Sequence, residues 1–525
     1  MIDPGTLSVL WGGFRDVAAT MGSALRTSAY SIAVRDGDDF STAFFDPDGR
    51  LVAQGEFSPG HLGAMPFVVR HVVALHHDDA EEGDAFVIND PYAGSGHLPD
   101  VFLVSPVFVE GTLIGWLANG THHSDMGGYA VGSQAVMGVS ELYQEGLVLP
   151  CTRLYVRGEV SRDVLGIVLA NVRTPDLVRG DLAAQHNANE AGAERVRALA
   201  ARHGTEATIA AMAQVISGTE IAIRERIAAL PDGVYRFETE LEDWGSDTPP
   251  IAVVVTATID GETVTVDFTG SGASVPAGIN CALNYTMAYT LCAFKALVAP
   301  EMPQNEGTIA PLNVVAPLGS YFNPAPPAAV GGRQLAAPRI FEAVTGALSQ
   351  AAPRGGVAGF GDMANPIISG RREDGSRYVF YDLVIGSLGG HPEAAGTDGL
   401  VGPHNPSNIP VEVQEASAPI RVERFELVDG TGGRGSHDGG RAVRRELRLL
   451  QGENVSITLL AERARRGAKG LFGGGDGSPG EYDIVRADGT VEPLHSKGRA
   501  VLAAGDLVRI QTPGAGGWGE VAGDE

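Results

Sequence analysis

The stretch "NDPYAGSGHLPD", residues 89–100, is polar, rich in turn-forming residues and nearly free of side chains that a core could bury. A second polar stretch, "NGTHHSDMGG", follows at residues 119–128. The sequence between them, "VFLVSPVF" and "TLIGWLA", is apolar, has the length of two strands and is interrupted by Glu110-Gly111, which favours a tight turn. This pattern predicts a β-hairpin that brings the two polar stretches together at its open end.

The register of that hairpin decides which side chains meet. In antiparallel pairing about this turn, the residue numbers of each cross-strand pair sum to about 221. Asp100 is then expected opposite Thr121, beside His122. His97 is expected near Ser124 on the same rim. The hairpin therefore gathers imidazole and carboxylate groups from two loops, and the glycines around them allow the backbone to approach closely.

These side chains fit a divalent metal site. His97, Asp100 and His122 are the expected ligands, because two imidazoles and one carboxylate leave coordination positions open, as catalytic sites do. His123 or Asp125 is expected either as a fourth ligand or as a group that orients a ligand. A mixed nitrogen and oxygen set accepts zinc, manganese or iron, with zinc and manganese foremost. From spacing alone, a pair of polar loops with solvated histidines remains the alternative.

Length and composition restrict the class of protein. A chain of 525 residues with 44% hydrophobic content can form two to four globular domains, and the formal net charge of −26 argues against a general nucleic-acid binder or a protein of anionic membranes. The three cysteines form no CxxC pair, so neither a thiolate zinc site nor a disulfide framework is expected. No apolar run reaches about 18 residues and no basic leader is present, which favours a cytoplasmic protein.

Hydrophobic periodicity predicts an α+β fold, with a helix-rich N-terminal half that carries the metal-bearing hairpin and a β-rich C-terminal part. The N-terminal elements expected are a helix over 6–29, two short strands within 38–54, a loop leading into a helix within 60–77, a long helix ending at 203 and a helix over 206–230. A hairpin is expected within 250–270, and strands and turns alone after residue 408. The predicted domains are 1–232 with the metal site, 233–407 and the β-rich 408–525.

Common nucleotide and hydrolase motifs are absent. The sequence holds no GxxxxGK[ST], no HExxH and no GxSxG. The "GAGGWG" at 514–519 matches GxGxxG in form, but no helix can follow it in the six residues that remain, so we expect it to pack on a sheet. The sequence therefore predicts no nucleotide site made by this chain alone.

Several segments in order carry a resemblance to a known family. They include "DDFSTAFFDPDGRLVAQ", "HLGAMP", "NDPYAGSGHLPDVFLVSPVF", "HHSDMGG", "YQEGLVLP", "NVRTPDLVRGDLAAQ", "NEGTIAPLNVVAPLGSYFNP" and "SKGRAVLAAGDLVRIQTPGAGGWG". The chain resembles the hydantoinase B family over nearly its whole length. That family includes the B subunits of ATP-dependent hydantoinases and oxoprolinases and is related to the alpha subunits of acetone and acetophenone carboxylases.

The resemblance implies a partner and a ligand set. The family's B subunit works with an A subunit of actin-like ATPase fold, which binds ATP and magnesium and phosphorylates the substrate. Carboxylase-related members hold a metal with a His-x-x-Asp pair and a following His, which match His97, Asp100 and His122.

Further residues in matching segments are implied in acid–base or positioning roles. These are Asp39, Glu56 and His61, and they join His123 and Asp125 as expected catalytic residues.

The function implied is that of a B-type subunit in a hetero-oligomer. It would hydrolyse a hydantoin, oxoproline or lactam ring whose amide the A subunit has phosphorylated, with water activated by the metal or a carboxylate. The alternative is an ATP-dependent ketone carboxylase in which the metal stabilises an enolate. A third hypothesis is a non-catalytic scaffold that completes the partner's site.

Overall fold

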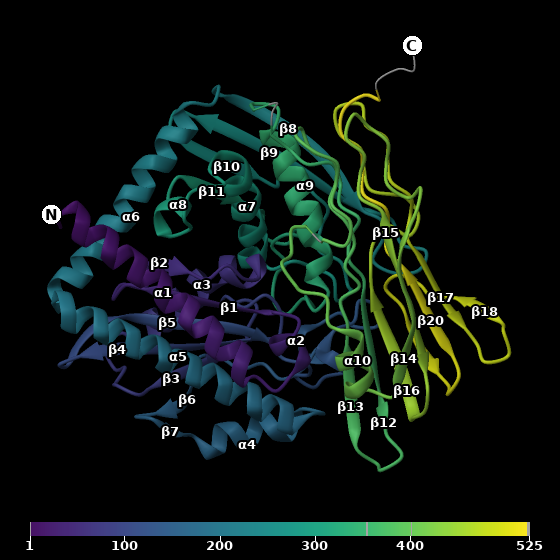
Figure 1. Cartoon of the computed structure of the whole chain (residues 1–525), viewed down its shortest axis with the longest axis horizontal. Helices are drawn as coiled ribbons and strands as arrows, with labels where there is room; N and C mark the ends of the chain where they lie inside the picture. Colours follow the sequence, from purple (N-terminus) through teal and green to yellow (C-terminus); the bar gives the residue numbers. More distant parts are fainter. Residues whose placement is uncertain (1, 353–354, 401, 522–525) are drawn as a thin grey trace.

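The computed structural model describes residues 2–352, 355–400 and 402–521 (Figure 1). Within these ranges helices and strands are both abundant, and the strands form four sheets. The predicted α+β class is therefore confirmed. No helix among the described residues is long and apolar enough to cross a bilayer.

The N-terminal part is built on a seven-stranded sheet with the order β2-β1-β5-β4-β3-β6-β7. Its strands are β1 (Phe40–Phe45), β2 (Leu51–Gln54), β3 (Ala85–Ile88), β4 (Asp100–Val109), β5 (Thr112–His122), β6 (Thr152–Val156) and β7 (Glu159–Val160). Its helices are α1 (Pro4–Ser28), α2 (Ile32–Arg35), α3 (Pro59–His76), α4 (Arg162–Asn171), α5 (Pro175–His203) and α6 (Thr205–Ala228), with 3-10 turns η1 (Val131–Ser133) and η2 (Leu142–Gln144).

Both faces of this sheet are covered. Leu117 of β5 packs in the cluster formed with α1 and α5, whereas its neighbour Trp116 packs in the cluster formed with α3. This alternation follows from the period of two in a strand, which sends successive side chains to opposite faces. The hairpin β4–β5 lies in the middle of the sheet and is therefore held from both sides.

The hairpin forms as predicted, but its register is shifted by one residue. Glu110 and Gly111 make the turn with φ of 49° and 80°. A β-bulge between Val107 and Phe108 then displaces the pairing, so that Asp100 lies opposite His122 and not opposite Thr121. The prediction about Thr121 was wrong because a bulge adds one residue to one strand. The correction places the carboxylate and the imidazole directly across from each other.

The predicted helices are present with small differences at their ends. The long helix α5 begins at Pro175 and ends before Gly204, whose φ of +89° suits only glycine at low cost. Helix α3 covers Pro59–His76, so the loop expected at the start of the segment 60–77 was wrong. Gly63 lies where α3 meets α7, and its missing side chain leaves room for Ala288.

The central part is a four-stranded sheet, β11-β10-β9-β8, with helices on it. The strands are β8 (Gly233–Leu241), β9 (Ile251–Asp260), β10 (Thr263–Asp267) and β11 (Leu312–Val315). The helices are α7 (Leu283–Val298), α8 (Glu306–Ile309) and α9 (Ala336–Leu348), preceded by the 3-10 turn η3 (Arg333–Leu335). Helix α9 is buried along its whole length against β8 and β9, and α7 lies between α9 and α3, so it links this part to the N-terminal part.

The C-terminal part is two sheets around one core, visible in green and yellow in Figure 1. One sheet has the order β13-β12-β16-β19 and the other β14-β15-β20-β17-β18. The elements are β12 (Asn365–Arg371), β13 (Arg377–Tyr381), α10 (Val411–Ser417), β14 (Ile420–Val428), β15 (Ala442–Leu449), β16 (Glu453–Leu460), β17 (Glu481–Val485), β18 (Val491–Pro493), β19 (Arg499–Leu502) and β20 (Leu507–Gln511).

Two expectations for this part need comment. Helix α10 follows Pro410, so the expectation of strands and turns alone after residue 408 was wrong; the buried Gln414 ties this helix to Asp382. The division into 1–232, 233–407 and 408–525 stays a prediction. One sheet joins β12 and β13, which precede residue 408, to β16 and β19, which follow it.

The "GAGGWG" segment lies among other glycine-rich segments, not on a regular sheet. The Gly516 amide donates to the Gly359 carbonyl, Gly517 donates to Gly475, and Gly390 donates to the Gly516 carbonyl. Glycine is needed because backbone atoms of neighbouring segments fill the space where a Cβ would stand. The segment therefore has a structural role, and the absence of a nucleotide site made by this chain alone stays a prediction.

Candidate functional site

Asp100 is the centre of a buried polar cluster at the open end of the β4–β5 hairpin. Its Oδ1 lies 2.9 Å from Nε2 of His97 and 3.2 Å from Nδ1 of His122. The two imidazole nitrogens lie 3.2 Å from each other. All three side chains are buried. The structure thus brings together the three residues predicted as metal ligands. Among the described residues, this is the one group of histidine, cysteine and carboxylate side chains whose ligand atoms lie close enough to share a metal ion.

The spacing of these three atoms fits a common divalent ion. Ligands at about 2.1 Å from zinc or manganese stand roughly 3.0–3.4 Å apart in octahedral or tetrahedral geometry. The separations of 2.9 to 3.2 Å between Nε2 of His97, Oδ1 of Asp100 and Nδ1 of His122 fall close to this range. Three protein ligands leave at least one position for a substrate oxygen or water. The donor set therefore suits a catalytic metal, which stays a proposal.

Electrostatics favour the metal-binding forms of His97 and Asp100. Burial, reinforced by the Arg333 guanidinium, lowers the pKa of His97 to about 3. Burial alone would raise the pKa of Asp100, but Arg333, His97 and His61 outweigh it and hold that pKa well below its ordinary value. A neutral imidazole and an ionised carboxylate are the forms that bind metal, so no proton competes for them near neutral pH.

The second nitrogen of each imidazole is also held. His97 Nδ1 donates to the backbone carbonyl of Gly331 at 2.9 Å, which leaves the lone pair on Nε2. His122 Nε2 lies 3.2 Å from the side-chain nitrogen of Gln134. Gly331 is fixed in turn by Glu145, whose carboxylate accepts its amide and that of Val330. Burial raises the pKa of Glu145 to about 8.

Arg333 neutralises the buried carboxylate from the far side. Its guanidinium bonds Oδ2 of Asp100 and lies over the ring of Tyr285, 4.0 Å from the ring centre. Gly96 gives this pair its space, because a Cβ there would collide with Arg333 Nε and stand 2.9 Å from Asp100 Oδ2. The second glycine of "AGSGH" therefore has a steric role at the site.

We expect Gly96→Ala to disrupt the site without unfolding the chain. The added methyl group must displace the Arg333 side chain from Asp100, and a displacement of about 1 Å at a catalytic centre costs roughly a hundredfold in kcat/KM. Gly166→Ala in α4 is the matched control, because a Cβ there meets no atom within 4 Å. Equal activity of both variants would show that the Arg333–Asp100 contact is unimportant.

Two further predicted residues line the same cavity. His61 Nε2 lies 3.1 Å from Asp100 Oδ1 and 4.0 Å from Asp39 Oδ1, so its ring stands between two carboxylates. Burial lowers the pKa of His61, but Asp100 and then Asp39 outweigh it and raise that pKa above the ordinary value. His61 Nδ1 is buried and forms no hydrogen bond with the described residues.

The other three predicted catalytic residues lie elsewhere. His123 faces α5, where its Nε2 meets Gln185 at 3.0 Å. Asp125 forms an ion pair of 2.7 Å with Arg173 and does not line the cavity. Glu56 is exposed on a neighbouring cleft. The structure therefore assembles five of the eight predicted residues and leaves these three outside the cluster.

Most of the remaining wall was not predicted from the sequence. It comes from α7, η3, the residues just before β12, the end of β13 with the residues after it, and the segment after residue 401. Its residues are Tyr285, Tyr289, Arg333, Gln334, Met363, Tyr381, Leu383 and His404. None belongs to a spaced motif, and Arg333 stands 233 positions from Asp100. Arg333 in "GGRQL" offered no signal beyond a lone basic residue between apolar segments.

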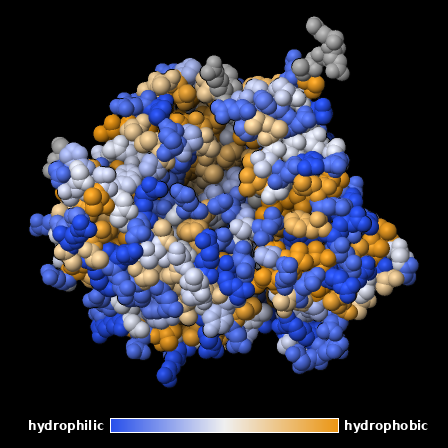
Figure 2. Space-filling view, in the orientation of Figure 1, coloured by the Kyte–Doolittle hydropathy of each residue, from blue (hydrophilic) through white to orange (hydrophobic). Residues whose placement is uncertain are grey.

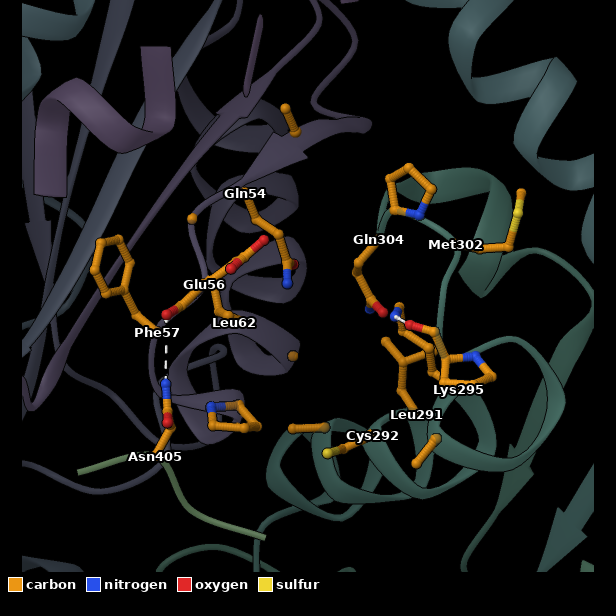
Figure 3. Close-up of a pocket in the computed structure, with 18 of the residues that line it drawn as sticks. Gln54, Glu56, Phe57, Leu62, Leu291, Cys292, Lys295, Met302, Gln304 and Asn405 are labelled. Atoms are coloured by element: carbon orange, nitrogen blue, oxygen red, sulfur yellow. Dashed lines mark hydrogen bonds between the residues drawn. The ribbon is translucent and has the colours of Figure 1, made fainter. Parts of the chain in front are cut away.

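The cluster encloses a cavity of about 40 Å³ that borders two larger clefts. One, of about 680 Å³, lies between the β2–α3 region and α7, and shares His404 with the cavity. In Figure 3 Gln54 and Glu56 face Lys295 and Gln304 across it. Figure 2 shows a hollow on this face of the molecule above its centre, in the region that α7 occupies in Figure 1.

The second cleft, of about 780 Å³, shares Tyr381 with the cavity. The Tyr381 ring also stacks beside His122, with ring centres 4.8 Å apart. The two clefts are large enough for a small molecule, whereas the cavity at the cluster holds one small group.

Comparison with solved structures shows the same architecture. An ATP-dependent caprolactamase from Pseudomonas jessenii superposes with a TM-score of 0.90 at 25% identity, over 99% of this chain and 92% of that chain. The nucleotide-free acetone carboxylase superposes with a TM-score of 0.89 at 17% identity, over 98% and 76%, which shows a shared fold.

Sequence relatives cover the chain from end to end. An uncharacterized protein of Methanocaldococcus jannaschii is 33% identical over 99% of this chain and 91% of its own length. The B subunit of a putative D-/L-hydantoinase from a Pseudomonas species is 31% identical over 99% and 90%. The family model described as hydantoinase B/oxoprolinase matches residues 3–521. The chain therefore belongs to the hydantoinase B/oxoprolinase family.

Proposed function

We propose that this chain is the B-type subunit of an ATP-dependent cyclic amidohydrolase that opens a hydantoin, oxoproline or lactam ring. The observation that carries the proposal is the buried cluster of His97, Asp100 and His122, whose cavity shares His404 with a cleft large enough for a small ring. Relatives named as a hydantoinase subunit and a caprolactamase support the class of substrate. The likeness to acetone carboxylase is one of fold and does not favour a carboxylase.

The chemistry divides between a metal and the side chains around it. A divalent metal on the three ligands, when bound, supplies a Lewis acid for the reacting oxygen. Arg333 holds the Asp100 carboxylate in its ionised form. We assign proton transfer to His61 and Asp39, because His61 Nε2 lies between the carboxylates of Asp100 and Asp39, which raise the pKa of this imidazole.

The proposal includes a partner. An amide ring is stabilised by resonance, and nothing in the described residues resembles a phosphate-binding loop. We propose that an A-type ATPase subunit phosphorylates the substrate, and that the two chains form a hetero-oligomer with more than about 2,000 Å² of buried surface, because the activated species would hydrolyse if released to water. ATP and magnesium would bind to that partner.

The test uses the chain co-expressed with its A-type partner. Hydantoin, 5-oxoproline and caprolactam are offered with and without ATP and bicarbonate, and ring opening is followed by chromatography. We expect ring opening that requires ATP and both chains and is indifferent to bicarbonate. Substrate loss that requires bicarbonate would favour the carboxylase. Full activity of a complex carrying His97→Ala and His122→Ala would favour the scaffold.

A further inference from the structure

A pair of buried amides connects a proposed metal ligand to the cavity. His122 Nε2 accepts from Gln134 Nε2 at 3.2 Å, and Gln134 Oε1 accepts from Gln334 Nε2 at 2.9 Å. Both glutamines are buried, and Gln334 lines the cavity. Gln334 Oε1 is buried and has no hydrogen-bond partner among the described residues. The chain of contacts thus ends in one unpaired atom at the cavity.

The direction of these hydrogen bonds is tied to the tautomer of His122. An imidazole nitrogen that accepts a hydrogen bond carries no proton, so in this arrangement the proton of neutral His122 is on Nδ1. Nδ1 is, however, the nitrogen that faces His97 Nε2 and Asp100 Oδ1. A ligand nitrogen needs its lone pair, so a metal on Nδ1 requires the proton to move to Nε2.

We propose that loading of the metal site reverses both amides. His122 Nε2 then donates to Gln134 Oε1, and Gln134 Nε2 donates to Gln334 Oε1. Each reversal exchanges the oxygen and nitrogen of one amide and leaves the heavy-atom positions as they are, so no repacking is needed in a buried site. Its result is that Gln334 presents an N–H group at the position where it now presents Oε1.

The reversed amide joins two other nitrogen donors in the cavity wall. Arg333 Nε is buried and unpaired among the described residues, and so is His404 Nε2. The Tyr289 hydroxyl, itself approached by that of Tyr285 at 3.4 Å, lies 2.7 Å from His404 Nδ1. Tyr289 therefore donates to Nδ1, which puts the proton of a neutral His404 on Nε2.

These hydrogen-bond donors indicate which chemical group of a substrate binds in the cavity. Arg333, Gln334 and His404 would all offer N–H groups, so this side of the cavity suits an oxygen that accepts hydrogen bonds: the oxygen of an activated amide or the oxyanion formed on attack. This step rests on the proposed function, whereas the reversal of the amides does not.

The reversal is tested by metal affinity on the full chain, without substrate or partner. Gln134→Glu can only accept from His122, and Gln134→Leu can do neither; zinc and manganese dissociation constants are measured by competition with a chelator. We expect Gln134→Glu to bind metal within about threefold of the wild type, and Gln134→Leu to bind 10- to 100-fold more weakly. Equal losses in both variants would overturn the proposal.

A second measurement on the wild type guards against misfolding of a buried glutamate variant. In the zinc-loaded chain with ¹⁵N-labelled histidine, we expect the His122 ring, assigned by its loss in His122→Asn, to carry its proton on Nε2. A proton on Nδ1 in the loaded protein would contradict the reversal.

The donor set is tested in the assembled, metal-loaded complex. If Gln334 offers an N–H group, Gln334→Glu should lower kcat at least as far as Gln334→Leu, by about a hundredfold, in complexes shown by elemental analysis to hold metal. If Gln334→Glu is active and Gln334→Leu is not, Gln334 offers an acceptor and the assigned ligand group is wrong. Absence of ATP-dependent ring opening in the wild-type complex would instead count against the proposed function, and the affinity result would stand.

Discussion

Asp100→Asn is expected to abolish metal binding and to lower ATP-dependent ring opening by about a thousandfold or more. The amide keeps the shape of the side chain but removes the charge on which the site depends. Asp100 Oδ1 contacts His97, His122 and His61, and its Oδ2 bonds Arg333. A neutral side chain would leave that guanidinium buried without a counter-charge. Metal content by elemental analysis and turnover in the assembled complex measure the effect.

The control for this substitution is Asp48→Asn. Asp48 lies in the exposed turn between β1 and β2, and 74% of its side chain is accessible, so we expect metal content and turnover to stay at the wild-type level. A thermal unfolding curve separates loss of the site from loss of the fold. Retained metal in Asp100→Asn would refute the ligand assignment, and retained turnover would place the chemistry elsewhere.

The ligands could be predicted from the sequence because they depend on local structure. Two strands joined by Glu110-Gly111 bring their outer ends together whatever surrounds them, so His97, Asp100 and His122 had to meet. The bulge that shifts the register has no such signal, because Val107 and Phe108 fit a regular strand equally well.

The residues that complete the site could not be predicted in this way. Arg333 and Gln334 begin the 3-10 turn η3 of the central part, Tyr381 ends β13, and His404 lies between β13 and α10. Their proximity to Asp100 is set by the packing of α3 on α7 and of the C-terminal part on α7. Conversely, His123 and Asp125 looked equivalent to His122 in sequence, but the strand period and the Arg173 ion pair turn them away.

The wall of the site also depends on a buried ion pair beside it. Asp382 follows Tyr381, whose ring packs on His122. The Asp382 carboxylate receives two hydrogen bonds, of 2.7 and 2.8 Å, from Arg445 of β15, and one of 2.7 Å from Gln414 of α10. Both charged side chains are fully buried. Three elements of the C-terminal part are thus joined at the residue next to the site.

Asp382→Asn is expected to destabilise the protein by roughly 3–5 kcal/mol, because it leaves the Arg445 guanidinium buried without its counter-charge. Arg445→Met should lower the free energy of unfolding by a similar amount, because it leaves the Asp382 carboxylate buried without a counter-charge. The double variant should lose less free energy of unfolding than the sum of the two single losses, since it leaves no unpaired charge. Denaturant unfolding of the four proteins measures the coupling, and additive losses would show that the two charges do not interact.

The same pair is expected to affect the metal site, because Tyr381 is the neighbour of Asp382 and packs on His122. The single variants should therefore lose metal affinity at temperatures where they remain folded. The control is Glu238→Gln, which breaks the exposed Arg236–Glu238 pair on β8 and should leave metal affinity unchanged.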